Sequence, residues 1–376
     1  MLKQLALLLL CSNMSQAIAQ NAKEYWLNPE VNRVNCEAPR SSFFAYESPE
    51  LAMNADKTAS SRYLSLEGMW KFKFVKDHQD RPANFYEINY DDASWENFPV
   101  PGLFEINGHG DAIYKNVGYA WYTQFRSNPP LVEEKNNYTG SYRKFVEIPK
   151  DWKGENIYLH VGSATSNLSV WVNGKFVGYS EDSKVAAEFN LTPYLKAGEK
   201  NLIAMQVMRW CDGSYLEDQD FWRLTGIERD VYLQAYPKLT VWDFFLHAGL
   251  DSRYRDGIFN ATVDLRAFAD SEPGKGQVEM KLVDKAGKTV WAQKRKFEMK
   301  GEAETLSFSG RIKNVAKWTA ETPELYDCIL TLRDGEGNTS VTACKTGFRK
   351  IEIIGGTVVC SSPLFLAIFH HKKFRR

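Results

Sequence analysis

The sequence has no excess of charge of either sign. Lysine and arginine together number 47, aspartate and glutamate also number 47, and the formal net charge at pH 7 is zero. A chain without excess positive charge has no overall electrostatic attraction for nucleic acid or for an anionic membrane. We therefore expect no nucleic-acid partner. No internal repeat or low-complexity segment is evident either.

Cysteine is also scarce, and the six cysteines show no paired metal-ligand spacing. Cys328 and Cys344 lie symmetrically about the turn sequence Asp334-Gly335-Glu336-Gly337, so we expect them to face each other across a hairpin. Two small thiols are the expected state there, although an exported protein permits a bridge.

A long hydrophobic run is missing, which excludes a membrane span. The N-terminus instead combines a basic start at Lys3, the short apolar run Leu5 to Leu10 and small residues at Ala17-Ile18-Ala19. This order is typical of a cleaved secretory signal peptide, and the apolar part is too short to cross a bilayer. We predict a signal peptide at residues 1–19 and export to the periplasm or the medium.

No long stretch has a hydrophobic period of 3.6, which argues against a helical domain. Residues 20–62 lack periodic patterning and are predicted to form an extended arm. From residue 63 to 236 short alternating segments indicate strands, and Asn173-Gly174 between two of them is the strongest hairpin signal in the chain. This pattern predicts an all-β sandwich.

A second group of strands fills residues 237–352. About seven alternating segments, beginning near Val241 and ending near Phe348, follow one another at immunoglobulin-like intervals, with turn residues at Asp284 to Gly287 and at Asp334-Gly335. We predict an immunoglobulin-like β-sandwich that acts as a spacer, since it contains no cluster of acids with aromatics.

The segment from Asp212 to Asp230 is too polar for a core strand. Glu217, Asp218 and Asp220 offer carboxylates that can accept sugar hydroxyls or hold a cation, and the adjacent Phe221 and Trp222 offer flat apolar faces. A binding loop and a solvated acidic turn with a buried tryptophan fit these residue types equally well.

Resemblance separates these alternatives. The segment, together with Arg209-Trp210 before it, resembles the signature that ends the N-terminal sugar-binding domain of the large bacterial β-galactosidases of glycoside hydrolase family two. Five further motifs occur in the order of that family: Asn28-Pro29-Glu30-Val31, Leu66 to Phe72, Asp111 to Val117, Trp171 to Tyr179 and Gly347-Phe348-Arg349. The resemblance covers roughly residues 25 to 354. It implies a jelly roll for the first sandwich and a subunit-contact role for the arm, within a homo-oligomer.

The resemblance also implies substrate and metal sites. Asn116 matches an asparagine that reaches the galactose pocket, and Asp220 matches an aspartate that contacts the sugar and a sodium ion. A structural magnesium site of the family maps to Asn28, Val31, Glu181 and Asp212, but the sequence has Tyr25 where a ligating carboxylate is expected. The implied cofactors are therefore Na⁺ and Mg²⁺.

No catalytic residue is assigned to this chain. Retaining glycosidases use two carboxylates about 5 Å apart, and in the resembling family both belong to a (β/α)₈ barrel that follows the two sandwiches. Here the resemblance ends where the barrel would begin, and we interpret residues 353–376 as an aberrant tail. A shifted reading frame would explain it, and a short docking tail is the alternative.

We therefore predict the N-terminal part of an exported β-galactosidase, inactive alone and binding β-galactosides weakly. Three alternatives stay open: the N-terminal part of a β-glucuronidase or β-mannosidase, a free-standing carbohydrate-binding module, and a fragment that complements a barrel-containing chain.

Overall fold

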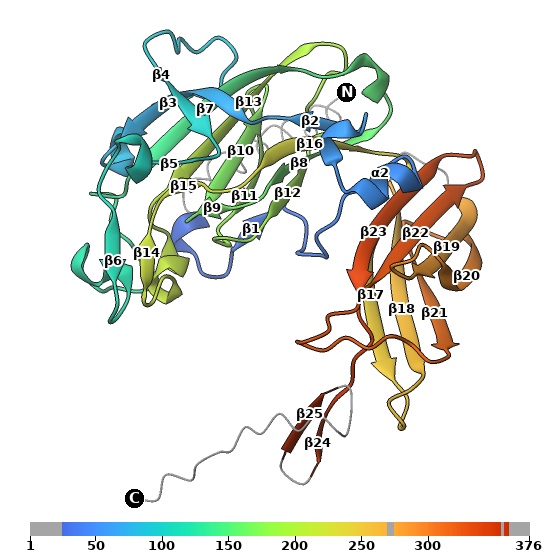
Figure 1. The fold of residues 1–376 in the computed structure, drawn as a ribbon. Coiled ribbons are helices and arrows are strands. Elements are labelled where there is room, and N and C mark those ends of the chain that lie inside the picture. The colour runs from blue at the N-terminus through green and yellow to red at the C-terminus, as the bar shows by residue number, and fades with distance from the viewer. Residues whose placement is uncertain (1–24, 269–273, 355–356, 361–376) are drawn as a thin grey trace, which may run out of the picture. The chain divides into compact units, whose positions relative to one another are not determined.

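The computed structural model describes residues 25–268, 274–354 and 357–360, and these form two compact units. The first unit contains the chain up to Pro39 and then Arg62–Ala235, and the second contains Arg40–Ser61 and the chain from Tyr236 onward. Both units are built from β-strands (Figure 1). The prediction of two successive β-sandwiches is confirmed, and the described residues contain no (β/α)₈ barrel.

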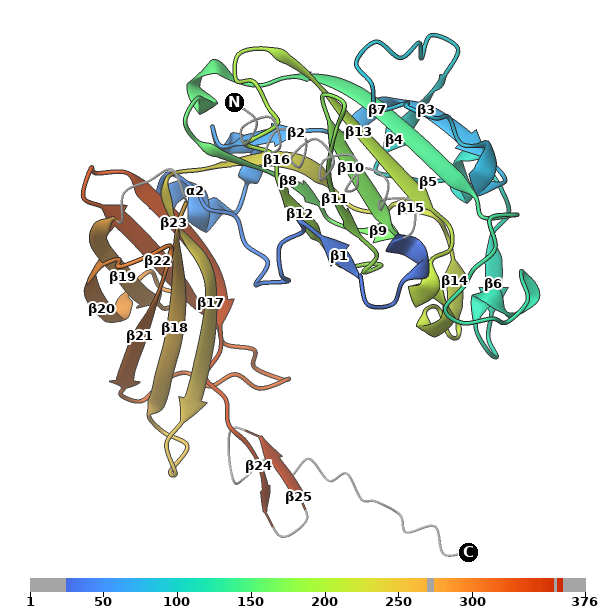
Figure 2. The ribbon, with the colours of Figure 1, turned by 180° about the vertical axis from the view of Figure 1, so that it is seen from behind.

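The first unit is a sandwich of two main sheets. A seven-stranded sheet has the order β1-β11-β10-β13-β7-β3-β4, and a four-stranded sheet has the order β12-β8-β16-β2 (Figure 2). Two small sheets, β5-β15-β9 and β14-β6, complete the unit. The strands are β1 (Arg33–Val34), β2 (Tyr63–Ser65), β3 (Gly68–Val75), β4 (Glu96–Val100), β5 (Gly102–Leu103), β6 (Ile113–Lys115), β7 (Thr139–Glu147), β8 (Asn156–Val161), β9 (Ala164–Thr165), β10 (Leu168–Val172), β11 (Lys175–Ser180), β12 (Ala187–Asn190), β13 (Lys200–Met208), β14 (Phe221–Arg223), β15 (Gly226–Ile227) and β16 (Val231–Tyr236).

Short 3₁₀ turns connect these strands. They are η1 (Tyr25–Leu27), η3 (His78–Asp80), η4 (Glu105–Asn107), η5 (Ala120–Thr123), η6 (Lys150–Trp152) and η7 (Asp212–Leu216).

The core of the first unit follows from strand alternation. In β10 the side chains of Leu168, Val170 and Val172 are buried in the core, whereas Ser169 and Trp171 point to the other face and are half-buried. Successive side chains of a strand point to opposite faces of the sheet, so the sequence decides which face is covered. One face of the seven-stranded sheet therefore packs into the sandwich, and the other carries Ser169 and Trp171.

The predicted Asn173-Gly174 hairpin is present between β10 and β11. Both turn residues have positive φ, 51° for Asn173 and 84° for Gly174. This left-handed geometry matches the twist of the flanking strands, and asparagine and glycine adopt it most readily.

The second unit has the seven predicted strands in two sheets, with the orders β17-β18-β21 and β20-β19-β22-β23. The strands are β17 (Leu239–Leu250), β18 (Gly257–Ala267), β19 (Lys275–Val283), β20 (Thr289–Glu298), β21 (Ala303–Ile312), β22 (Tyr326–Asp334) and β23 (Thr339–Thr346). Cys328 and Cys344 are direct register partners on β22 and β23, and both are free thiols, as predicted.

The segment predicted as one extended arm differs from that expectation, because it is divided between the units. In the first unit β1 pairs with β11. In the second, helix α2 (Pro49–Asn54) is capped by Ser48, whose side chain accepts a hydrogen bond from the Leu51 amide, and is followed by the 3₁₀ turn η2 (Lys57–Ala59). Capping by serine and a proline at the first turn explain this local helix, which hydrophobic periodicity could not reveal in six residues.

The end of the second unit forms a small hairpin in which β24 (Ile351–Ile354) pairs with β25 (Thr357–Cys360). The predicted signal peptide at residues 1–19 and most of the predicted tail lie outside the described residues. In the part of the chain that the structure describes, no helix is long and apolar enough to span a membrane.

Candidate functional site

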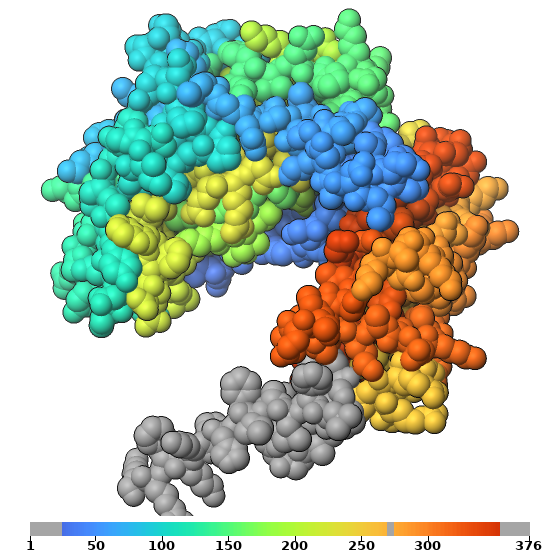
Figure 3. All heavy atoms as spheres, viewed as in Figure 1, coloured from blue at the N-terminus to red at the C-terminus, as the bar shows by residue number. Residues whose placement is uncertain are grey.

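The two predicted sugar-binding residues lie next to each other on the first unit. Strands β6 and β14 pair antiparallel with Phe221 opposite Lys115 and Trp222 opposite Tyr114. Asp220 directly precedes β14 and Asn116 directly follows β6, so the two residues occupy adjacent positions at the same end of this ladder. Figure 3 shows the two segments side by side at the surface of the unit, one cyan-green and the other yellow-green.

Both side chains are exposed and uncommitted. Asn116 and Asp220 are exposed, and neither makes a hydrogen bond or ion pair with any other described residue. Asp220 has a φ of 52°, a left-handed conformation that aspartate and asparagine tolerate better than most residues. The pair thus presents an amide and a carboxylate to whatever approaches this edge, and both groups can bind hydroxyls.

Arg223 holds the loop that carries Asp220. Its side chain is fully buried, and its Nη1 lies 3.0 Å from Glu217 Oε2 and 2.6 Å from Asp218 Oδ2. Its Nη2 donates to Ser214 Oγ at 3.0 Å and to the carbonyl oxygen of Arg209. Two of the three acids that the sequence offers for ligand binding, Glu217 and Asp218, are therefore committed to this internal cation. These ion pairs favour a structural role for Glu217 and Asp218 over ligand binding, because Arg223 points into the loop and needs counter-charges.

Asp218 is the more tightly held of the two acids. Its side chain is only 4% exposed and also lies 2.5 Å from Lys184 Nζ. Burial by itself raises the pKa of Asp218, but the charges of Arg223 and Lys184 outweigh it and leave the pKa below its usual value. Asp218 therefore stays ionised and fixes the loop.

A second buried arginine holds the start of the β6 segment. Arg209 Nη2 donates to the carbonyl oxygen of Asp111 at 2.6 Å, and Arg209 Nη1 lies 3.4 Å from Asp111 Oδ1. The guanidinium groups of Arg209 and Arg223 lie 5.4 and 4.7 Å from the ring centroid of the buried Trp210. Both strands of the β6–β14 ladder are thus tied to a single rigid cluster, which fixes the position of Asn116 and Asp220.

Exposed apolar side chains lie on the same two segments as Asn116 and Asp220. Tyr114 and Trp222 are each about half exposed, and their ring centroids lie 5.1 Å apart. Phe221 is 52% exposed and Val117 83% exposed. Large exposed apolar side chains next to polar groups are typical of an interaction surface. This end of the unit is therefore suited to contact a ligand or another protein surface.

A separate buried cluster contains Glu181, Cys211 and Asp212. One ligand atom from each lies within 4.8 Å of the others, and all three residues are buried. Glu181 accepts a hydrogen bond of 2.8 Å from the Tyr179 hydroxyl, and Asp212 Oδ1 accepts one of 2.9 Å from the Gly213 amide. Asp212 Oδ2 is buried without any hydrogen-bond partner.

Burial disfavours the ionised forms of all three groups in this cluster. Burial, together with the neighbouring Asp212, raises the pKa of Glu181 to about 9, and burial also raises the pKa of Asp212 and of the Cys211 thiol. Two buried carboxyls side by side cannot both ionise without a compensating charge. A proton on one carboxyl or a hard cation, which prefers carboxylate oxygens, supplies that charge, and Asp212 Oδ2 is the atom left unsatisfied.

The arm runs past Glu181, close to the predicted ligand Val31. Arg33 on β1 pairs with Ser180 on β11, and the Glu181 amide donates to the carbonyl oxygen of Asn32 at 3.2 Å. Val31 thus directly precedes Asn32, the residue that contacts Glu181. The exposed Asn28 side chain accepts a hydrogen bond from the Glu30 amide within its own turn.

Tyr25 does not supply a carboxylate, and its ring instead packs 5.4 Å from the ring of Tyr179. It therefore contributes apolar cover above the residue whose hydroxyl contacts Glu181.

Comparison with known families decides the identity of these domains. Residues 63–237 match the family model "Glycosyl hydrolases family 2, sugar binding domain", and residues 239–349 match "Glycosyl hydrolases family 2". The chain belongs to glycosyl hydrolase family 2. The first matched range coincides with the first sandwich and includes the β6–β14 ladder, and the second matched range coincides with the second sandwich.

Curated relatives share sequence with nearly the whole chain. A β-galactosidase of Priestia megaterium is 35% identical over 342 residues, which cover 90% of this chain and 33% of that protein. A β-galactosidase of Pseudoalteromonas haloplanktis is 37% identical over 358 residues, covering 91% of this chain and 32% of that protein. The chain spans about a third of the length of these relatives and is homologous to their N-terminal part.

Solved structures show the same fold. β-Glucuronidase 2 of Bacteroides uniformis superimposes with a TM-score of 0.64 at 21% identity, over 80% of this chain and 34% of that one. A β-galactosidase described as putative, from Bacteroides fragilis, gives a TM-score of 0.60 at 18% identity, over 80% of this chain and 43% of that one. At these identities the likeness concerns the fold alone.

Proposed function

We propose that this chain is the sugar-binding and spacer part of an exported β-galactosidase. It supplies Asn116 and Asp220 as one edge of a galactoside site, next to a catalytic barrel that is not among the described residues. The supporting observation is the β6–β14 register, which puts these two exposed and uncommitted side chains side by side. By itself the chain is expected to bind β-galactosides weakly and to hydrolyse none.

The chemistry of Asn116 and Asp220 suits sugar binding and does not require them to take part in bond cleavage. An amide and a carboxylate at an edge can hold sugar hydroxyls and a sodium ion, and neither needs to act as an acid or base in bond cleavage. The exposed rings of Tyr114, Phe221 and Trp222 supply an apolar surface against which a barrel can pack. Glu181 and Asp212 are proposed to hold magnesium, an ion that would fix the arm against β11 and stabilise a homo-oligomer through that arm.

Complementation tests the proposal. The purified chain, alone and mixed with a barrel-containing fragment of a family-2 β-galactosidase, is assayed on a chromogenic β-galactoside. We expect activity only in the mixture, and a large loss of that activity in Asn116→Ala and Asp220→Asn. Asn89→Ala is the matched control, because Asn89 is also exposed and makes no side-chain bond to any described residue. Equal activity in all variants would contradict the assignment, as would hydrolysis by the chain alone.

Mixtures with barrel-containing fragments of a β-galactosidase, a β-glucuronidase and a β-mannosidase separate the competing specificities. The relatives with 35 and 37% identity carry the name β-galactosidase, whereas the β-glucuronidase likeness at 21% identity concerns the fold. Activity on the matching substrate that is restored by the β-glucuronidase or β-mannosidase barrel, and not by the β-galactosidase barrel, would favour the alternative. Export is a further proposal, which N-terminal sequencing of the mature protein tests: the first residue is expected to be Gln20.

A further inference from the structure

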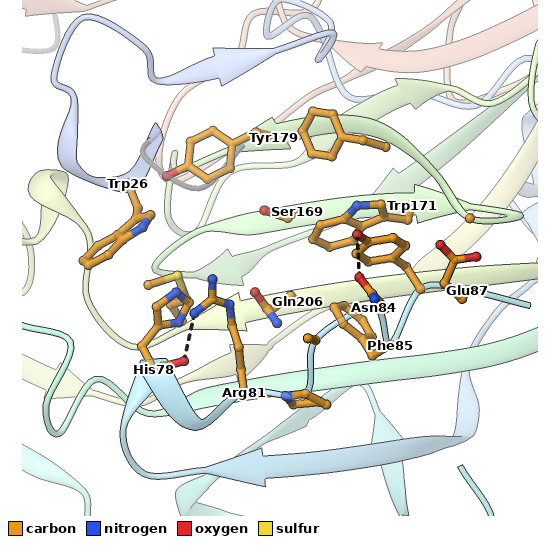
Figure 4. Close-up of a pocket in the computed structure, with 16 residues that line it drawn as sticks. Trp26, His78, Arg81, Asn84, Phe85, Glu87, Ser169, Trp171, Tyr179 and Gln206 are labelled. Carbon is orange, nitrogen blue, oxygen red and sulfur yellow. Dashed lines mark hydrogen bonds between the residues drawn. The ribbon is translucent and has the colours of Figure 1, made fainter. Parts of the chain in front are cut away.

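A cavity of about 520 Å³ lies on the first unit, away from the β6–β14 ladder. Its floor is the outer face of the seven-stranded sheet, where Ser169 on β10 is the register partner of Tyr179 on β11 and of Gln206 on β13. One wall comes from residues 81–87, and Trp26 of the arm lies beside His78 at the end of the cavity away from Trp171 (Figure 4). None of the lining residues belongs to β6 or β14.

Aromatic rings form one end of the cavity. The rings of Tyr86 and Trp171 are stacked, with centroids 5.3 Å apart and planes 6° apart. Phe176 contacts Trp171 edge-on at 5.7 Å. The three residues are half-buried, so each keeps some exposed surface. The buried Phe85 also packs edge-on against Trp171 at 5.2 Å, so residues 81–87 cover part of this aromatic group. The surface that stays exposed offers an apolar contact on a sheet face that normally carries polar residues.

Polar groups line the remaining surface. Gln206 uses its amide nitrogen to donate to Ser141 Oγ at 3.0 Å, and its carbonyl oxygen makes no hydrogen bond to a described residue. Glu87 is exposed, and its carboxylate makes no bond to a described residue. Asn84 accepts from the Tyr86 hydroxyl, and Arg81 donates to the carbonyl oxygen of His78. Figure 4 shows Gln206 and Ser169 between the Trp171 end and the Trp26 end.

This combination fits one class of ligand. A strongly anionic ligand would be repelled by Glu87, and Arg81 offers only one guanidinium group to offset that repulsion. A purely apolar ligand would remove water from Gln206, Asn84 and Glu87 without replacing their hydrogen bonds. A sugar ring has an apolar face of C–H groups and a rim of hydroxyls that both donate and accept. Its size suits a cavity in the usual range of roughly 300 to 1,000 Å³ for small-molecule sites.

We propose that this cavity is a second carbohydrate-binding site of the first unit, for a mono- or disaccharide, with Trp171 and Tyr86 as the stacking surface. Glu87, Asn84 and Gln206 bind the hydroxyls. The site is complete within the described residues of the first unit and therefore needs no barrel. It gives the protein a way to hold a saccharide independently of the Asn116–Asp220 pair.

Ligand titration of the full purified chain tests this proposal. Lactose, cellobiose and galactose are the probes, and binding is followed by tryptophan fluorescence and by saturation-transfer NMR. We expect saturable binding of at least one probe in the millimolar range. Trp171→Ala is expected to weaken it about tenfold, as removal of an aromatic contact does. Glu87→Ala, which removes an exposed side chain, should weaken it about threefold.

Matched controls make the outcome decisive. Glu67→Ala removes another exposed glutamate whose side chain makes no bond to a described residue, and it should leave the affinity unchanged. Asn116→Ala removes the galactoside edge, so binding that remains in this variant and is weakened further by adding Glu87→Ala belongs to the cavity. Failure of the galactoside-edge proposal and failure of this one are therefore distinguishable. Thermal melting identifies any variant that does not fold, and Glu87→Ala then remains as the test. Absence of saturable binding by all three probes up to about 50 mM, or binding lost in Asn116→Ala and kept in Glu87→Ala, would overturn the proposal.

Discussion

Replacing Arg223 by methionine is expected to destabilise the first unit strongly. The guanidinium is fully buried and lies against Glu217 and Asp218, and the second of these carboxylates is only 4% exposed. Breaking a buried ion pair by removing one partner costs about 3 to 5 kcal/mol, because the other charge is left uncompensated. Lys184, 2.5 Å from Asp218, still compensates part of that charge, so we expect a loss near the lower limit, about 3 kcal/mol.

Urea denaturation followed by tryptophan fluorescence measures this loss, because Trp70, Trp152 and Trp210 are buried in the first unit. With a slope of about 3 kcal/mol per molar urea, the midpoint should fall by about 1 M. The control Arg126→Met removes an exposed arginine whose side chain makes no bond to a described residue, and it should change stability by less than about 0.5 kcal/mol.

A double variant tests the stated cause of the effect. If the loss comes from an uncompensated carboxylate, then adding Asp218→Asn to Arg223→Met should recover part of the stability. A loss below about 1 kcal/mol in the single variant, smaller than any buried pair should give, would refute the reasoning. So would a double variant no more stable than Arg223→Met.

Three further predictions concern other parts of the first unit. Burial raises the pKa of Asp111, but the Tyr138 hydroxyl and the Arg209 charge outweigh it and lower the pKa below its usual 3.8. The ionised Asp111 therefore contributes its full stabilisation above about pH 4, and this stabilisation is lost as the pH falls through the lowered pKa. Urea melts at pH 6 and pH 3 should show a smaller acid-induced loss of stability in Asp111→Asn than in the native chain. Magnesium in hundredfold excess over its dissociation constant should stabilise the native chain by about 2.7 kcal/mol, and thermal melting should show no such gain in Asp212→Asn. Gly140→Ala should cost about 1 to 3 kcal/mol, because the added methyl group would lie 2.5 Å from the Phe104 ring and 2.6 Å from the Phe72 ring; an unchanged urea midpoint would contradict the packing described for the core.

The sequence carried most of the information about the fold. Alternating segments marked the seven strands of the second unit, and Asn173-Gly174 marked a turn whose two positive φ values only a few residue types adopt readily. Helix α2 was not predictable from periodicity, since six residues make less than two turns. Its signals are local, a serine cap followed by proline.

The candidate site was predictable only in part. Motifs singled out Asn116 and Asp220, but only the register of β6 and β14 shows that they are neighbours. Residue spacing also could not show that Asp218 forms an ion pair with Arg223. The direction of the Asp218 side chain depends on its left-handed backbone, and the position of Arg223 depends on the Trp210 ring against which it packs. A usable signal did exist for the cavity: alternation in Leu168-Ser169-Val170-Trp171-Val172 places Trp171 on the face opposite the core.

The split of residues 25–61 between the units affects how the protein is made. Arg40 donates to the Tyr236 hydroxyl at 2.8 Å and lies 4.4 Å from the Trp242 ring, and Tyr46 bridges to Val341. The second unit thus contains a segment that leaves the ribosome before residues 62–235, whereas its own strands emerge afterwards. It cannot close until strand β23, which ends at Thr346, has been synthesised, so the first sandwich has time to fold before the 40–61 segment meets its partner strands. A gene fragment that starts at residue 237 would lack this segment, and expression of the second sandwich alone should include residues 40–61, supplied in the same chain or as a separate peptide.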